Sequence, residues 1–197
     1  MLAGAASGGA ETFFVSLAAA FAGFDVEQRA VIRRNPTRAA LLRDAGVPVR
    51  EVAYAGWFDF ATRLALRREV AAFAPDVALA FMSRAADRMP EGRHLKLARL
   101  GGFYDIKYYR RCDHLICITH GIRRHVIAQG WPEERAHYLA NFAEADPAPA
   151  ADRAAHGTPA DAPLVFTPCR LHAAKAIDVL LRAVATLDGV YLWVAGD

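Results

Sequence analysis

The sequence predicts an α/β fold in which short parallel strands alternate with helices. Residues 77–81, Val-Ala-Leu-Ala-Phe, are apolar throughout, as a strand covered on both faces of a parallel sheet must be. Two further apolar runs, 164–166 and 190–195, flank residues 177–187, whose apolar positions recur every three to four residues and predict an amphipathic helix. This order is typical of a βαβ unit. With 54% hydrophobic and 23% charged residues, the composition excludes a disordered chain.

The first part of the chain is expected to alternate in the same way. Only residues 1–3 are available as a strand before a glycine-rich turn, Gly4 to Glu11, which leads into a helix ended by Gly23. The inner face of that helix is expected to carry Phe14, Leu17, Ala18 and Phe21. A strand at 25–32, a short helix from Asn35 to Gly46 and a strand at 47–54 are predicted next.

A longer helix is predicted over residues 60–73. Its inner side is expected to carry Phe60, Leu64, Val70 and Phe73, and its outer side Arg63, Arg67 and Arg68. The three arginines form either a solvated helix face or a contact for anionic lipid or acceptor. Beyond residues 77–81, strands are predicted at 94–99, before Thr119 and at 137–139, with a helix from Thr119 to Gly130 and a short one from Trp131.

Residues 144–163 differ from both flanking parts in composition. They are mostly Ala, Pro, Asp and Gly with almost no large apolar side chain, which predicts a linker or a loose loop. We therefore expect a parallel-sheet domain at 1–143, a linker at 144–163, and the start of a second domain at 164–197. A single βαβ unit is too small to bury both faces of its own sheet.

Two cations lie in the loop between the strand at 164–166 and the helix at 177–187. They are Arg170 and Lys175. In parallel sheets, ligands bind at the carboxyl ends of strands, where such loops lie. Arg offers a planar fork for two oxygens and Lys a mobile point charge, so the pair suits a diphosphate better than a single carboxylate. The alternative is that both are ordinary solvated charges.

The spacing Arg-Leu-x3-Lys-x-Ile-Asp from Arg170, ending in Val-Ala-Gly-Asp at 194–197, resembles the start of the second domain in family 4 retaining glycosyltransferases. Gly8-Gly9-Ala-Glu resembles the glycine motif of their first domain. The resemblance implies the GT-B architecture of two Rossmann-like domains, with Arg170 and Lys175 as catalytic residues that hold the donor diphosphate without a metal. Ala176 stands where the family usually has Gly, a mild change for a residue that starts a helix.

The same resemblance implies a set of substrate-binding positions at the ends of the first-domain strands. A Gly-Gly pair stands at 101–102 where the family often has His-Gly, which removes the expected catalytic histidine. Ser83, Arg84 and Thr119 have an alternative role as helix caps. The implied substrate-binding residues are Gly8, Gly9, Ser83, Arg84, Gly101, Gly102, Thr119, Arg123 and Asn141.

The resemblance also predicts that the chain is incomplete. We expect the true chain or reading frame to begin several residues upstream, because the first strand of such a sheet is central. Family members continue beyond the C-terminus and carry a Glu-x7-Glu motif that binds donor sugar and ribose, which this sequence lacks. As written, the fragment is expected to be inactive alone.

The implied function is transfer of a sugar, with retention, from a nucleoside diphosphate sugar to a glycan or glycolipid acceptor such as cell-envelope polysaccharide or lipopolysaccharide. No cofactor and no metal are expected, and Cys112, Cys117 and Cys169 lack metal-ligand spacing. A net charge of +3 is too slight to predict a nucleic-acid partner. No apolar run approaches the ~20 residues of a membrane span. A cytoplasmic protein with weak peripheral membrane contact is expected.

Two other functions remain open at this point. The βαβ pattern alone also fits a nucleotide- or dinucleotide-binding oxidoreductase. Against it stand the glycine spacing and Arg33-Arg34, which occupy the place of the acidic residue expected after the second strand. The other alternative is a non-catalytic scaffold that keeps only the sheet.

Overall fold

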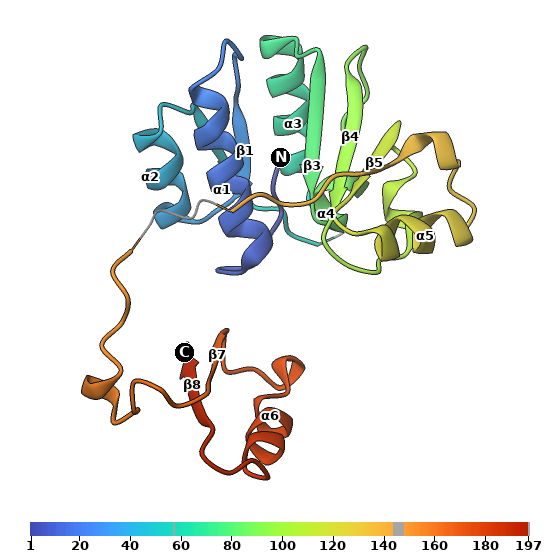
Figure 1. Ribbon diagram of the computed structural model, residues 1–197. Coiled ribbons are helices and arrows are strands. Elements are labelled where there is room, and N and C mark those ends of the chain that lie inside the picture. The colour runs from blue at the N-terminus through green and yellow to red at the C-terminus, as the bar shows by residue number, and fades with distance from the viewer. Residues whose placement is uncertain (57, 144–147, 197) are drawn as a thin grey trace. The chain divides into compact units, whose positions relative to one another are not determined.

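A computed structural model describes residues 1–56, 58–143 and 148–196. The chain divides into two compact units, Met1–Ala143 and Glu144–Asp197. Each unit is described by itself (Figure 1). Both are α/β, as the alternation of apolar runs and amphipathic segments predicts.

The first unit alternates strands and helices from its glycine-rich turn onward. The strands are β1 (Ala30–Arg33), β2 (Val49–Val52), β3 (Val77–Phe81), β4 (Leu95–Leu100), β5 (His114–Cys117) and β6 (Ala136–Tyr138). The α-helices are α1 (Gly9–Ala22), α2 (Pro36–Asp44), α3 (Phe60–Phe73), α4 (Ser83–Asp87) and α5 (His120–Ala128). Two 3-10 helices, η1 (Ile106–Tyr109) and η2 (Glu133–Arg135), lie between them.

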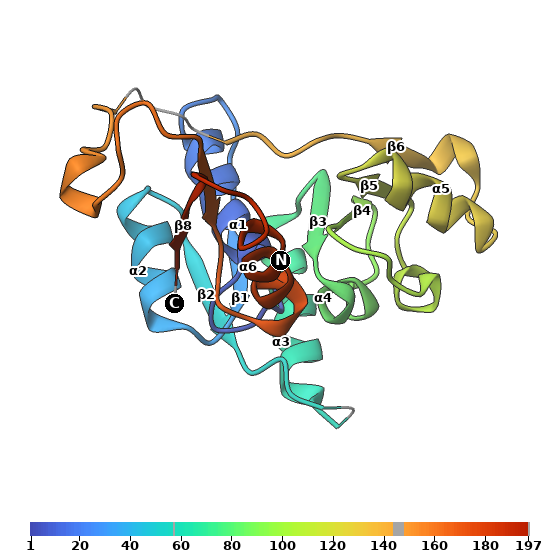
Figure 2. The ribbon, with the colours of Figure 1, turned by 60° about the horizontal axis from the view of Figure 1, so that its bottom comes forward.

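Residues 1–3 join the two parts of the sheet. β1 pairs with β2, and β3 to β6 pair in sequence order, all in parallel. Leu2 bridges Ile32 of β1 on one side and Phe81 of β3 on the other. Its N–H donates to the Val31 carbonyl at 2.9 Å, and the Phe81 N–H donates to the Met1 carbonyl at 2.8 Å. Figures 1 and 2 both show the N-terminus between β1 and β3. Residues 1–3 thus take the central position predicted for them.

Helices cover both faces of this sheet, because neighbouring strand residues point to opposite faces. On one face, Ile32 and Phe81 pack with Phe14 of α1 and Leu42 of α2. The other face is larger. Its buried core includes Val31, Ala80 and Leu100 from the strands, Leu66 of α3, Ala85 of α4, and Ile122 and Val126 of α5. The doubly covered parallel sheet predicted from the apolar strands is therefore present.

Several predicted details of the helices and strands are wrong. The inner face of α3 carries Thr62 and Leu66, whereas Phe60 and Leu64 are 68% and 49% exposed. The spacing of apolar residues in α3 is compatible with two inner faces, and the face that packs on the sheet is the one centred on Leu66. Phe21 of α1 is 39% exposed, and β1 begins at Ala30 instead of at residue 25. Among the helices within the described ranges, none has the length and apolar content needed to cross a bilayer.

The second unit is a βαβ unit with additional turns. β7 (Leu164–Pro168) and β8 (Tyr191–Ala195) pair in parallel from Leu164 with Tyr191 to Pro168 with Ala195. Between them lie the 3-10 helix η4 (Ala173–Lys175) and α6 (Ile177–Val184). No side chain of α6, β7 or β8 is buried. A single such unit does not cover its own apolar faces, as expected.

The segment that the sequence predicts to be a linker has more structure than expected. Residues 144–147 lie outside the described residues, but η3 (Ala154–His156) forms a 3-10 turn within the remainder. Thr158 is buried, and its hydroxyl accepts a hydrogen bond of 3.0 Å from the Trp193 indole on β8. A tryptophan N–H needs an acceptor when it is covered, so this contact orders the turn.

The central position of Leu2 gives a test of the sheet. Leu2→Ala removes a fully buried side chain and should lower the free energy of unfolding by about 2–5 kcal/mol. Leu64→Ala, the same substitution on the exposed face of α3, should cost less than about 0.5–1 kcal/mol. Urea unfolding followed by circular dichroism would measure both. Equal costs for the two variants would contradict the central placement of residues 1–3.

Candidate functional site

The carboxyl ends of the parallel strands in the first unit meet at one edge of its sheet. Seven segments arrive there: the turn after residues 1–3 and the loops after β1 to β6. Counted with residues 1–3 as the first strand, the strand order reverses between residues 1–3 and β3. Ligands of such sheets bind in the crevice at this reversal, which makes this edge the candidate site.

The glycine-rich turn before α1 is built around a carboxylate. Oε1 of Glu11 accepts a hydrogen bond of 2.7 Å from the Ala5 N–H, and Glu11 is buried. A Cβ atom at Gly4 would lie 2.2 Å from that oxygen, and one at Gly8 would lie 2.6 Å from Oε2. Both glycines therefore make room for Glu11. A Cβ at Gly9, the first residue of α1, would meet nothing within 4 Å.

A buried arginine holds the same turn from its other side. Nη2 of Arg38 donates to the carbonyls of Ala5 and Ala6 at 2.9 and 3.0 Å. Burial lowers the pKa of the Arg38 guanidinium, and the charge of Glu11 opposes that shift. Asn35 adds a hydrogen bond of 3.0 Å to the Ala6 carbonyl. The turn predicted to face phosphates is thus fixed by an internal pair of charges, of which sequence reasoning identified only the Glu11 motif.

Ser83 and Arg84 follow β3 and are turned toward partners within the protein. The Ser83 hydroxyl lies 3.0 Å from the Tyr109 hydroxyl, and Nη1 of Arg84 donates to the Tyr54 carbonyl at 3.0 Å. Before them, Met82 has a φ of 73°, a conformation that side-chain-bearing residues seldom adopt. Ser83 is the first residue of α4, and no side chain caps that helix. The predicted capping role of Ser83 is therefore absent.

Gly101 and Gly102 end β4 at the same edge. A Cβ atom at Gly102 would lie 3.1 Å from the Tyr104 ring, so the chain turns closely against that side chain. Thr119 caps α5, because its hydroxyl accepts a hydrogen bond of 3.1 Å from the Ile122 N–H. The predicted N-cap is confirmed.

Arg123 is directed away from this edge. Its Nε donates to the carbonyl of Ala136 at 2.8 Å, and its Nη2 lies 3.0 Å from a carboxylate oxygen of Glu133. Ala136 is the first residue of β6, so the guanidinium reaches toward the amino end of that strand. Of the predicted first-domain residues, Arg123 is the one that the structure does not bring to the carboxyl edge.

Asn141 contacts Arg99 on β4, a residue that the sequence analysis did not identify as part of the site. The Arg99 Nη2 donates to the Asn141 side-chain oxygen. The guanidinium carbon lies 4.3 Å from the centre of the Phe13 ring and 5.2 Å from that of Phe81. Arg99 is only 6% exposed, and burial lowers the pKa of its guanidinium. The available signal was an arginine in a mainly apolar strand, two residues before the glycine pair.

Arg170 and Lys175 lie in the second unit, in the loop that connects β7 with α6. Both are exposed, and within the described ranges neither side chain forms an ion pair. Ala176 follows with a φ of 51°, in the left-handed region that favours glycine. The replacement of the usual glycine is therefore not a mild change, because an L-residue costs about 1–2 kcal/mol in this conformation.

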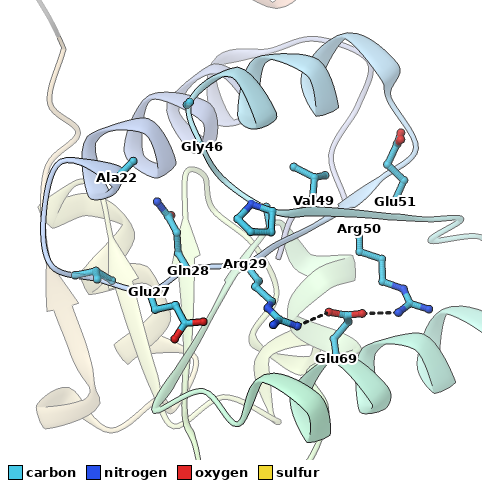
Figure 3. Close-up of a pocket in the computed structure, with 13 residues that line it drawn as sticks. Ala22, Glu27, Gln28, Arg29, Gly46, Val49, Arg50, Glu51 and Glu69 are labelled. Atoms are coloured by element: carbon cyan, nitrogen blue, oxygen red, sulfur yellow. Dashed lines mark hydrogen bonds and ion pairs between the residues drawn. The ribbon is translucent and has the colours of Figure 1, made fainter.

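A hollow of the first unit lies at the opposite edge of the sheet. It encloses about 870 Å³ beside Ala30 and Val49, the first residues of β1 and β2. Figure 3 shows Arg29 and Arg50 pointing toward Glu69, with which both form ion pairs. Since this hollow is at the amino ends of the strands, it is not the candidate site. Among the residues that the structure describes, no cluster of three His, Cys, Asp or Glu could hold a metal ion.

The close approach of Glu11 to Gly4 can be tested with a double-mutant cycle, which measures the interaction free energy between the two positions. Gly4→Ala should cost about 1–3 kcal/mol of unfolding free energy, because the new methyl group displaces the Glu11 carboxylate. In a Glu11→Ala background the same methyl group has room. The double variant should therefore be less destabilised than the sum of the single variants, by about 1–2 kcal/mol. Gly9→Ala is the matched control and should change stability little. Strict additivity at Gly4 and Glu11 would refute the packed turn.

Comparison with known proteins gives relatives in one functional class. No protein-family model matches the sequence. Two proteins of Rhizobium meliloti (strain 1021) are similar over 96% of this chain: the lipopolysaccharide core biosynthesis glycosyltransferase LpsE, 37% identical over 201 residues, and its counterpart LpsD, 35% identical over 198. The chain spans 56% of the length of each relative.

Solved structures of low sequence identity share the fold. HepE of Anabaena in complex with UDP-glucose matches with a TM-score of 0.72 and 14% identity, over 98% of this chain and 58% of HepE. The lipopolysaccharide outer core galactosyltransferase WaaB, in its apo form, matches with a TM-score of 0.64 and 14% identity, over 98% of this chain and 60% of WaaB. The chain therefore has the parallel α/β, Rossmann-like fold of GT-B glycosyltransferases.

Proposed function

We propose that the protein containing this chain is a glycosyltransferase that moves a sugar from a nucleoside diphosphate donor to a glycan acceptor of the cell envelope, with the lipopolysaccharide core as the acceptor class. The observation that carries the proposal is similarity along nearly the whole chain to two proteins named as lipopolysaccharide core biosynthesis glycosyltransferases. The complexes of HepE with UDP and UDP-glucose favour a uridine diphosphate donor.

Arg170 and Lys175 are the proposed catalytic residues. When the bond between the anomeric carbon and the phosphate oxygen breaks, negative charge develops on the departing diphosphate. An arginine fork and a lysine point charge, both exposed on one loop, would stabilise that charge without a metal. Neither cation is bound to a carboxylate among the described residues, so both are available for an anion.

The carboxyl edge of the first unit is the proposed binding surface for the acceptor. Gly8, Gly101, Gly102, Thr119 and Asn141 lie in the turns that follow its strands, and Gly9 and Ser83 are the first residues of α1 and α4. Arg84 is better assigned a supporting role, because its guanidinium holds the Tyr54 carbonyl. Transfer with retention and membership of glycosyltransferase family 4 are proposed on the resemblance of the Arg170 to Lys175 loop. A cytoplasmic location with weak contact to the inner membrane face is a separate proposal, which rests on the short apolar runs and the slight positive charge of the sequence.

Substitution of Lys175 tests the proposed chemistry. In the full-length protein, Lys175→Ala should lower kcat for transfer from UDP-glucose or UDP-galactose to lipopolysaccharide core oligosaccharide by about 100- to 1000-fold, as loss of one charge-stabilising group does elsewhere. Lys107→Ala, an exposed lysine paired with Asp105 in the first unit, is the control and should retain activity. The rate of UDP release measures both. Equal turnover in the wild type and Lys175→Ala would reject the assignment.

A further inference from the structure

The first unit contains three buried arginines at or near its carboxyl edge, and they differ in how their charge is balanced. Arg88 forms an ion pair of 3.3 Å with Asp59, and both side chains are almost fully buried. Arg38 forms no ion pair among the described residues, but it shares the glycine-rich turn with Glu11, whose charge opposes the effect of burial on the Arg38 pKa. Burying a cation far from any negative charge lowers the stability of a fold, so a carboxylate near each of these two arginines is expected.

Arg99 has no such partner. Within residues 1–56, 58–143 and 148–196, none of the ion pairs includes it. Its neighbours are the rings of Phe13 and Phe81 and the neutral amide of Asn141. Aromatic faces attract a guanidinium but carry no net charge, so they do not replace a carboxylate in a desolvated site. The guanidinium is therefore held in place, but no carboxylate of the described residues neutralises it.

The free side of Arg99 remains reachable. Nη1 of Arg38 and Nε of Arg88 are enclosed without a hydrogen-bond partner, but no nitrogen of Arg99 is. Nε and Nη1 of Arg99 have no hydrogen-bond partner among the described residues and are not among the fully enclosed atoms, so they keep some contact with solvent. A Cβ atom at Gly101 would lie 3.8 Å from the Arg99 Nη1, an ordinary contact distance, so the glycine leaves the guanidinium uncovered by a side chain at this position.

The elements that meet at Arg99 are those of the candidate site. Phe13 lies on α1, after the glycine-rich turn, and Phe81 ends β3 on the other side of the strand-order reversal. Asn141 comes from the segment after β6, and its neighbour Phe142 packs on Phe13 with ring centres 5.0 Å apart. A fork of N–H donors fixed between two rings is preorganised for two oxygens of one anion.

We propose that Arg99 recognises an anionic group, a sugar phosphate or a sugar carboxylate, on the acceptor. The group enters beside Gly101 and binds the nitrogens of Arg99 that Asn141 leaves free, while Phe13 and Phe81 keep the guanidinium in its plane. This inference rests on the proposed function and narrows its acceptor to an acidic glycan. Arg99 is then a specificity-determining residue of the carboxyl edge.

The test compares acceptors that differ only in charge. The full-length protein is titrated calorimetrically with lipopolysaccharide core oligosaccharide in three forms: intact, dephosphorylated with hydrogen fluoride, and carboxyl-reduced. Removal of the recognised group should raise the Kd by about 10- to 100-fold, the range of a charge-assisted hydrogen bond. The treatment that weakens binding identifies the group as phosphate or carboxylate. Equal Kd values for all three forms would overturn the proposal.

Two variants assign the effect to Arg99. Arg99→Met should bind the intact and treated acceptors alike, whereas Arg110→Met, which removes an exposed arginine directly after η1, should keep the wild-type ratio. Asn141→Asp covers the case in which Arg99→Met does not fold, because it places a carboxylate against the guanidinium with little change of shape. It should weaken binding of the intact acceptor about 10-fold and leave the neutralised acceptor unchanged. A wild-type ratio in Arg99→Met or Asn141→Asp would refute the role of Arg99.

The same titrations separate this inference from the proposed function. UDP release is measured with each acceptor in parallel. A charge-dependent Kd without transfer from any UDP-sugar would reject the proposed function and retain an anion-binding Arg99. Transfer with equal Kd values for all acceptors would retain the function and reject the inference.

Discussion

The pairing of residues 1–3 between β1 and β3 is the constraint on which the first unit depends. Without it, the chain has a two-stranded and a four-stranded sheet with no hydrogen bonds between them. Leu2 supplies both the ladder and a fully buried side chain in the core under α1 and α2. The next residue, Ala3, packs into the opposite core. A short segment therefore ties both helix layers together, and it also sets the direction in which the glycine-rich turn leaves the sheet.

The turn that follows Leu2 shows how the candidate site is held. A glycine-rich turn before a helix is often assigned a single purpose, close approach of a phosphate to the backbone. Here Gly4 and Gly8 are needed first for the Glu11 carboxylate, while Arg38 binds the carbonyls of the same turn. The helix N-terminus already has a negative charge beside it. An anion that approaches α1 would meet that carboxylate, whereas one that approaches Arg99 meets a cation that forms no ion pair within the described part of the chain.

Sequence patterns predicted the elements better than the side-chain contacts. The bounds of α3 and β3 are as predicted. Asp59 caps the start of α3 and Pro75 follows its end, while β3 is an unbroken apolar run, so the sequence leaves few alternative bounds. The inner face of α3 was only partly as predicted: Val70 and Phe73 are half-buried, but Phe60 and Leu64 are exposed, because two apolar stripes compete and only tertiary burial chooses between them. Periodicity also cannot show that Arg123 turns toward Glu133, or that Arg99 lies between two rings. Such contacts join residues far apart in the sequence, and no local pattern encodes them.

Residues with strained backbone conformations lie beside the candidate cations Arg84 and Lys175. Four non-glycine residues of the described chain have positive φ, and two of them, Ala74 after α3 and Ala176 after η4, end helices. Tyr54 and Met82 follow β2 and β3 at the carboxyl edge, and Ala176 follows Lys175. Conformations of this kind cost about 1–3 kcal/mol and persist only where neighbouring contacts hold them. Thr62 and Arg84 do so for Tyr54, by hydrogen bonds to its N–H and its carbonyl. Arg84 therefore fixes the backbone that follows β2, and this contact accounts for a cation at the end of β3 without a ligand.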